Sequence, residues 1–237
     1  MTYASGMKFT RPEHISTLDA LPRMPEWVTS VRPEDLEDVS FFSGASLSHL
    51  HLVLSREEVP HTLLRDRLAL RATEACVAFS GRPERAGELR DAVHLLRPGD
   101  LPGPAGETYL AWRRAVERPV SIKALGRALP TFEPGQLAAW FDAGKGGPVD
   151  RAAMVLETVL REVPRADEAA LILADAALAQ ALGWDHLVPL LAAGLKRADL
   201  RKQGDDLRSA CHRGLISSTI KAVRQAAELA RRAEHLK

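Results

Sequence analysis

Apolar residues recur at helical spacing over almost the whole of this 237-residue chain, and proline and glycine interrupt the pattern at intervals. Residues three and four positions apart share one face of an α-helix, so this recurrence predicts amphipathic helices. The chain lacks a convincing alternation of β-branched residues, which would mark a half-buried strand. We therefore expect an all-α fold, a multi-helix bundle or irregular helical array of roughly eight to ten helices with no substantial sheet.

Proline, glycine and capping residues place the ends of the expected helices. These helices span residues 33–54, 61–80, 83–96, 105–118, 121–128, 134–141, 149–163, 166–182 and 205–237. Pro33 suits the opening turn of the first helix, and the acidic residues after it complement the positive end of the helix dipole. Asp167 is expected to cap the helix over 166–182, which forms an αα-hairpin with its predecessor around Pro164.

The proline and glycine residues also divide the chain into regions. Residues 1–33 are expected to be an extended lead-in, because prolines interrupt any helix there, with Trp27 as the large apolar group that can anchor it. The other regions are an N-terminal helical region (34–142), a Gly-rich loop (143–148) and a C-terminal helical region (149–237), and the two helical regions can also form one continuous domain. The loop lacks the GxxxxGK[ST] spacing of a phosphate loop and follows no strand pattern.

Composition indicates a soluble, cytoplasmic protein. Hydrophobic residues make up 46% of the chain but aromatic residues only 5%, so leucine and alanine are expected to fill the core. Cys76 and Cys211 lie far apart and outside any CxxC spacing, which favours free thiols, and Cys76 falls on the apolar face of its helix. The chain shows neither a secretory signal nor an apolar run of the roughly 18 residues that a membrane span needs, so no membrane partner is expected.

The near-neutral net charge of +1 hides an asymmetry along the chain. Residues 195–237 carry 11 lysines and arginines against 5 acidic residues, a net charge of +6, whereas the remainder carries 21 against 26, a net charge of −5. A basic C-terminal helix can contact nucleic acid through phosphates, or a protein partner. It can equally pair with the acidic body of the protein or remain solvated.

The segment 90–106 combines charged, imidazole and turn-forming residues at a helix end and its exit loop. Asp91 and His94 are three residues apart and share a helix face, so the carboxylate can orient the imidazole as half of an acid/base pair. Arg90 and Arg97 are seven residues apart, two helical turns, and can flank the same site as ligands of an anionic group, with Arg113 as a further candidate. Asp100 is also a candidate binding residue, at the point where the chain turns back. The structural alternative is a network in which the acids pair with arginines and His94 ties down the loop.

Other histidines form weaker patterns. Trp184 and His186 precede Pro189 at a helix break and are candidates for lining a pocket, although such a cluster can also pack a corner. His49 and His51 point to different faces of one helix and cannot share a metal ion from there, and His212 has no partner nearby in the sequence. We find no metal signature, no cofactor motif and no Gly-x-Ser-x-Gly elbow.

The chain resembles members of an uncharacterised bacterial family, domain of unknown function 1403. The matching blocks are RDAVHL at 90–95, RPGD at 97–100, PGPAG at 102–106, WR at 112–113, ALGWDH at 181–186, VPL at 188–190, ACHR at 210–213 and ARRA at 230–233. The resemblance spans residues 36–236 and implies no established activity. Members of this family commonly continue past the position of Leu236 into a segment similar to a small winged helix, which weakens the expectation of a DNA-related role for a chain ending at Lys237.

Three functional hypotheses follow from these patterns. The first is a helical interaction or scaffold protein whose basic C-terminal helix contacts a partner. The second is an enzyme of unknown reaction in which Asp91 orients His94 as acid or base, and Arg97 or Arg113 binds an anion. The third is a nucleic-acid-associated protein.

Overall fold

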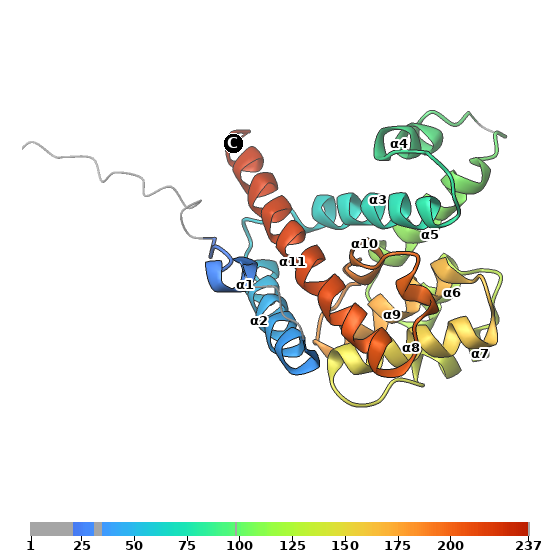
Figure 1. Ribbon diagram of the computed structural model, residues 1–237. Coiled ribbons are helices and arrows are strands. Elements are labelled where there is room, and N and C mark those ends of the chain that lie inside the picture. The colour runs from blue at the N-terminus through green and yellow to red at the C-terminus, as the bar shows by residue number, and fades with distance from the viewer. Residues whose placement is uncertain (1–20, 31–34, 98, 237) are drawn as a thin grey trace, which may run out of the picture.

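The computed structural model describes residues 21–30, 35–97 and 99–236, which form eleven α-helices, one short 3-10 helix and no strand (Figure 1). The helices are α1 (Glu26–Ser30), α2 (Leu36–Leu54), α3 (His61–Phe79), α4 (Ala86–His94), α5 (Gly103–Glu117), α6 (Ile122–Ala128), α7 (Pro134–Phe141), α8 (Pro148–Glu162), α9 (Asp167–Ala181), α10 (Leu191–Gly194), η2 (Asp199–Arg201) and α11 (Gly204–Glu234). The predicted all-α fold is confirmed, with two more short helices, α1 and α10, than the periodicity indicated.

The ends of the nine longer helices lie within three residues of the predicted positions, because local side-chain chemistry sets most of them. The carboxylate of Asp35 accepts the backbone N–H of Asp38 at 2.8 Å and caps α2. The hydroxyl of Ser121 accepts the N–H of Ala124 at 3.2 Å and caps α6 in the same way. Beyond α3, Gly81 adopts a φ of 78°, which glycine tolerates best.

Two local expectations were wrong. Residues 26–30 lie within the predicted extended lead-in but form α1 directly after Pro25, whose carbonyl accepts the N–H of Val28, since proline interrupts a helix but can precede one. Asp167 does not cap α9: it is the first helical residue, and Ala166 occupies the cap position without a side-chain hydrogen bond. The turn before it places Arg165 at a φ of 77°.

Helix α9 forms the centre of the molecule. Every residue from Ala169 to Ala179 is buried, and α8 packs along it as the predicted helical partner. One hydrophobic core joins residues on both sides of the Gly-rich loop, from Leu47 on α2 to Leu229 on α11. A smaller cluster of Val77, Leu89 and Ala105 holds α4 and the start of α5 against α3.

Asp175 is a fully buried carboxylate within α9. Its oxygens accept the backbone N–H groups of Leu190, Leu191 and Ala192 at 3.1, 2.8 and 3.4 Å. Burial raises the pKa of Asp175 to about 7, against the opposing effect of these three hydrogen bonds. The contacts tie α9 to the start of α10, which has no other side-chain cap in the described structure.

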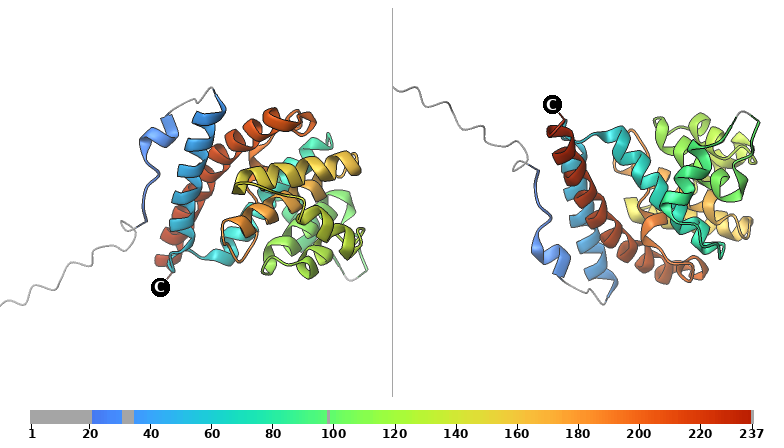
Figure 2. Two further views of the ribbon diagram at one scale, coloured as in Figure 1. Left: turned by 90° about the horizontal axis from the view of Figure 1, so that it is seen from below. Right: turned by 90° about the horizontal axis from the view of Figure 1, so that it is seen from above.

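Helix α11 crosses the molecule and packs against α2, α10, α8 and α3 (Figures 1 and 2). Both views in Figure 2 place α1, α2 and the C-terminal half of α11 together on one side of the remaining helices. Within the described residues, no helix is both long enough and apolar enough to cross a membrane.

The crossing of α10 and α11 depends on two glycines. A Cβ atom built on Gly194 would lie 2.3 Å from the carbonyl oxygen of Gly214, a separation that no real side chain adopts. A Cβ on Gly214 would lie 3.1 Å from the Gly194 carbonyl carbon. The two backbones therefore approach more closely than any residue with a side chain at position 194 allows.

Substituting Gly194→Ala should destabilise the protein by about 2 kcal/mol or more, because backbone atoms of α11 must move to admit the methyl group. Thermal and urea unfolding would measure the loss. Gly126→Ala on α6 is the matched control, since a Cβ there meets only Leu137 at 3.9 Å. Equal stability of the two variants would contradict the close-packing account.

Candidate functional site

The residues singled out around His94 lie on the outside of the molecule. His94 is the last residue of α4 and is exposed. Asp91 pairs with its neighbour Arg90 at 2.9 Å, and within the described residues no hydrogen bond joins Asp91 to His94. The Asp91–His94 acid/base pair therefore stays a prediction.

The remaining residues of that segment have structural contacts or face solvent. The carboxylate of Asp100 accepts the backbone N–H of Arg97 at 2.9 Å, and the Asp100 N–H donates to the Arg97 carbonyl at 3.0 Å. Arg113 is exposed on α5. Burial raises the pKa of Tyr109, while the positive charge of Arg113 acts in the opposite direction. These contacts resemble the network of the structural alternative.

Trp184 and His186 lie together in a different place, a cavity of about 430 Å³ that we call the histidine cleft. The cleft is enclosed by the end of α2, the first turns of α3 and the turn after α9. Its lining residues are His51, Leu54, Ser55, His61, Arg65, Gly183, Trp184, Asp185, His186 and Val188. The structure thus brings three histidines and an arginine to one cavity.

Backbone contacts hold the turn that carries Trp184 and His186. Gly183 has a φ of 69°, which favours glycine, and the N–H of Trp184 donates to the Ala179 carbonyl of α9. His186 forms an isolated β-bridge with Pro119, next to a hydrogen bond from the Val120 N–H to the Asp185 carbonyl at 2.8 Å. The segment between α5 and α6 therefore fixes one wall of the cleft.

Hydrogen bonds orient two of the three imidazoles. The indole N–H of Trp184 donates to Nδ1 of His51 at 2.9 Å, so a neutral His51 carries its proton on Nε2. Nε2 of His61 lies 3.1 Å from the carbonyl oxygen of Arg56 and donates to it. His49, two residues before His51, instead faces the Pro22 carbonyl at 2.8 Å, which confirms that these two histidines point in different directions.

The histidine cleft has a positive electrostatic character. Burial lowers the pKa of His186, and the charges of Arg65 and His61 lower it further, against the effect of Asp185. Burial also lowers the pKa of Arg65. His61 and Arg65 belong to the first two turns of α3, where the positive end of the helix dipole adds to the same field.

A second cavity, of about 600 Å³, lies between α2 and α8, and we call it the α2–α8 groove. Its lining residues are Ser40, Ser43, Gly44, Leu47, Ser48, His51, Leu52, Gly147, Pro148, Val149, Asp150, Leu182 and His212. His51 lines both cavities.

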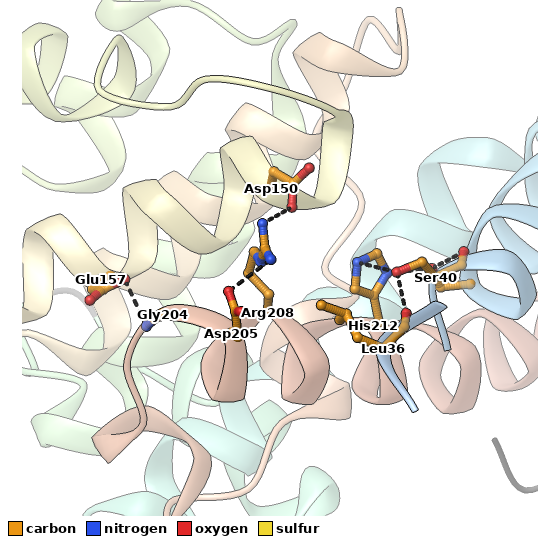
Figure 3. Close-up of polar contacts among 9 residues, drawn as sticks. Leu36, Ser40, Asp150, Glu157, Gly204, Asp205, Arg208 and His212 are labelled. Carbon is orange, nitrogen blue, oxygen red and sulfur yellow. Dashed lines mark hydrogen bonds and ion pairs between the residues drawn. The ribbon is translucent and has the colours of Figure 1, made fainter. Parts of the chain in front are cut away.

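His212 of α11 lines this groove and is buried. Its Nδ1 lies 2.6 Å from the hydroxyl of Ser43 on α2. Its Nε2 lies 3.2 Å from the hydroxyl of Ser40 on the same helix (Figure 3). The Ser40 hydroxyl also reaches the Leu36 carbonyl at 2.6 Å, and the Ser43 hydroxyl reaches the Ser40 carbonyl at 3.0 Å. The imidazole therefore joins α11 to α2 through both ring nitrogens.

The hydroxyls of Ser40 and Ser43 can provide hydrogen-bond partners for both ring nitrogens of His212, whether the imidazole is neutral or protonated. A neutral imidazole accepts a hydrogen from one serine and donates to the other, whereas an imidazolium donates to both while both hydroxyls donate to backbone carbonyls. Burial favours the neutral form and lowers the pKa of His212, with Arg208 adding to this effect and Asp150 opposing it.

Polar contacts also join α11 to α8 (Figure 3). The Arg208 guanidinium lies between Asp150 of α8 at 3.5 Å and Asp205 of its own helix at 2.7 Å. The N–H of Gly204 donates to the Glu157 carboxylate at 3.3 Å. Because these groups are partly exposed, each contact adds little stability, and of these residues only Asp150 lines the α2–α8 groove.

Sequence reasoning missed His212 and its serine partners, because the Ser43–His212 contact joins residues 169 positions apart. It identified Trp184 and His186, which stand at a visible helix break, but not His51, His61 or Arg65. The part of the chain that the structure describes contains no group of three or more His, Cys, Asp or Glu side chains placed to hold a metal ion.

A family model described as "Protein of unknown function (DUF1403)" matches residues 12–237. The match covers nearly the whole chain and extends further towards the N-terminus than the motif blocks, so the protein belongs to this family. No curated protein and no solved structure matches the chain.

The lowered pKa of His212 predicts a loss of stability on the acid side. The native state binds this proton less readily than the unfolded state, so the contribution of neutral His212 is complete above its unfolded pKa and is lost as the pH falls through the folded pKa. The unfolding free energy of the protein should therefore fall more steeply between pH 7 and about pH 5 than that of His212→Gln. Chemical denaturation at a series of pH values would compare them.

The difference between the two curves isolates His212, because Asp175, whose raised pKa acts in the opposite direction, is present in both proteins. His235→Gln, an exposed position at the end of α11, is the control and should follow the unmodified protein. Parallel curves for the protein and His212→Gln would refute the assignment.

Proposed function

We propose that this DUF1403 protein binds a small anionic ligand, a carboxylate or a phosphate, in the histidine cleft. The observation that carries the proposal is the basic lining: the Arg65 guanidinium and three imidazoles line the cleft together with a single carboxylate, that of Asp185. Partial burial strengthens such a field, because less water screens it. Trp184 provides an apolar wall and a donor that orients His51.

The protonation of the imidazoles supports this assignment. Burial is the main cause that lowers the pKa of His186, and nearby positive charge, chiefly that of Arg65, lowers it further; an anion would neutralise this second contribution. A bound anion should therefore raise the pKa of His186, and by linkage the protein should bind the anion more tightly as the pH falls. The guanidinium of Arg65 remains charged at neutral and mildly acidic pH and offers a bidentate contact to a carboxylate or a phosphate.

Calorimetric titration with inorganic phosphate and with acetate, at pH 6 and at pH 8, would test the proposal. We expect binding at both pH values and tighter binding at pH 6. Arg65→Gln should weaken the affinity by about tenfold or more, because it removes a charged hydrogen-bond donor. Arg67→Gln on the same helix is the control, since Arg67 does not line the cleft.

Binding of neither anion by the unmodified protein would overturn the proposal, and so would equal affinities of the Arg65 and Arg67 variants. Circular dichroism of each variant would establish that it has folded.

We also propose a cytoplasmic location and, from the family resemblance, a bacterial source. Cys76 and Cys211 are free thiols, as the sequence indicated, and both are buried. Burial raises the pKa of each thiol and keeps it protonated and unreactive. Free thiols are typical of proteins in a reducing compartment such as the cytoplasm.

A second candidate function is contact with an anionic partner through α11, the interaction role expected from its charge. The inner face of this helix is buried against α2 and α10, so only its outer face is free for a partner. On that outer face Arg213, Arg224 and Arg231 are exposed and are separated by 11 and 7 residues, about three and two helical turns. They therefore lie along one side of the helix, which also carries Glu228 between Arg224 and Arg231, in an ion pair with Arg232.

Electrophoretic titration with duplex DNA and with RNA would test the nucleic-acid form of this role. Retention at low salt that weakens at high salt is expected, because phosphate contacts release counterions. The double variant Arg224→Gln/Arg231→Gln should weaken retention, whereas Arg118→Gln/Arg127→Gln, which removes two exposed charges elsewhere, should not. Absence of retention at low salt would exclude nucleic acid as the partner.

A further inference from the structure

We infer that the ligand of the histidine cleft is amphipathic, an anionic head group in the cleft with an apolar chain that lies in the α2–α8 groove. This inference rests on the proposed anion-binding function and names the class of ligand: straight-chain carboxylates and phosphate monoesters. Four features of the two cavities support it: a shared wall on α2, a continuous opposite wall, an apolar groove lining and the placement of charge.

One face of α2 lines both cavities. Ser40, Gly44 and Leu47 in the groove lead to His51 at spacings of three or four residues, so these residues follow one another along a single helix face. The same face continues to Leu54 and Ser55 in the histidine cleft. The cleft and the groove are therefore consecutive along α2, with His51 at the junction.

The opposite wall is also continuous. Leu182 lines the groove, and the next two residues, Gly183 and Trp184, line the histidine cleft. The Trp184 indole donates to His51 across the junction at 2.9 Å. This hydrogen bond bridges the two walls at the junction, so a ligand that extends from the cleft into the groove passes over the exposed side of His51 and not between the two bonded side chains.

Apolar side chains dominate the accessible lining of the groove. Leu52 is 55% exposed, and Leu182 and Pro148 are partly exposed beside the buried Leu47 and Val149. Ser43 and His212 are buried and already hydrogen-bonded to each other, so they offer little to a polar ligand. Covering Leu52 with an alkyl chain removes apolar surface from water.

The placement of charge determines the orientation of the ligand. The groove holds the carboxylate of Asp150, which is partly neutralised by Arg208 at 3.5 Å and would repel an anionic head group. The positive charge of Arg65 lies in the histidine cleft, where the imidazoles add hydrogen-bonding groups for an anion. The head group therefore occupies the cleft and the chain extends past His51 towards Gly44, about 10 Å along the helix at 1.5 Å per residue.

Calorimetric titration of the full chain with acetate, butyrate, hexanoate, octanoate and decanoate, below their micellar concentrations, would test this inference. Complete burial of a methylene corresponds to about fourfold in affinity. In this open groove we expect affinity to rise by about twofold or more per methylene until the chain fills the groove, and then to level off.

Two variants would test whether the alkyl chain of the ligand lies in the groove. Gly44→Phe puts an aromatic ring over it at an exposed helical position where a Cβ has no neighbour within 4 Å. It should reduce the affinity for octanoate at least tenfold while the affinity for acetate stays unchanged. Leu52→Gln should weaken octanoate binding severalfold, whereas Leu63→Gln, an exposed leucine of α3 outside both cavities, should not.

Acetate binding without any dependence on chain length would overturn the inference and leave the proposed anion site in place. A dependence on chain length that survives in Gly44→Phe would also overturn it, because the chain would then lie elsewhere. If the unmodified protein binds none of these carboxylates, nor phosphate, both the inference and the anion-binding function fail.

Discussion

The buried carboxylate of Asp175 is the interaction on which much of this structure depends. It lies in a helix that is buried on every side over eleven residues, and it accepts three consecutive backbone N–H groups at the start of α10. A buried polar group is costly unless it is paired, so the carboxylate and these N–H groups require one another. The segment Leu190–Ala192 is thereby held at one position on α9. Next to that segment, Gly194 allows α11 to approach to backbone contact.

The position of α11 in turn affects the α2–α8 groove, which His212 of α11 lines. Helix α2 packs on α11, and the contacts of His212 with Ser40 and Ser43 join these two helices beside the groove. Arg208 and Gly204 join the beginning of α11 to α8, which forms the opposite side. A ligand in the cleft and groove would thus contact elements from both ends of the chain, and its affinity would depend on how α2 and α8 sit on α11.

Much of the helical framework could be predicted from the sequence, whereas the candidate site could be predicted only in part. The boundaries at Asp35, Ser121 and Gly81 follow from capping and glycine chemistry within a few residues. Trp184 and His186 attracted notice because they stand at a helix break. The pairing of Asp91 with His94 was inferred from their spacing and stays a prediction; the Asp91 carboxylate contacts the adjacent Arg90. Spacing shows which side chains share a helix face, and it does not show which partner each one meets.

The sequence by itself determined the all-α fold, the approximate ends of the longer helices and the family, because helix formation and capping depend on hydrogen bonds between residues only a few positions apart. Only the tertiary structure decided that His51, His61, Arg65 and His186 surround one cavity and that His212 meets Ser43. Those meetings depend on how α3, α9 and α11 pack, which follows from the shapes of buried faces and from close approaches such as that of Gly194 and Gly214. Hydrophobic periodicity predicts that a face is buried, but it does not specify against which helix.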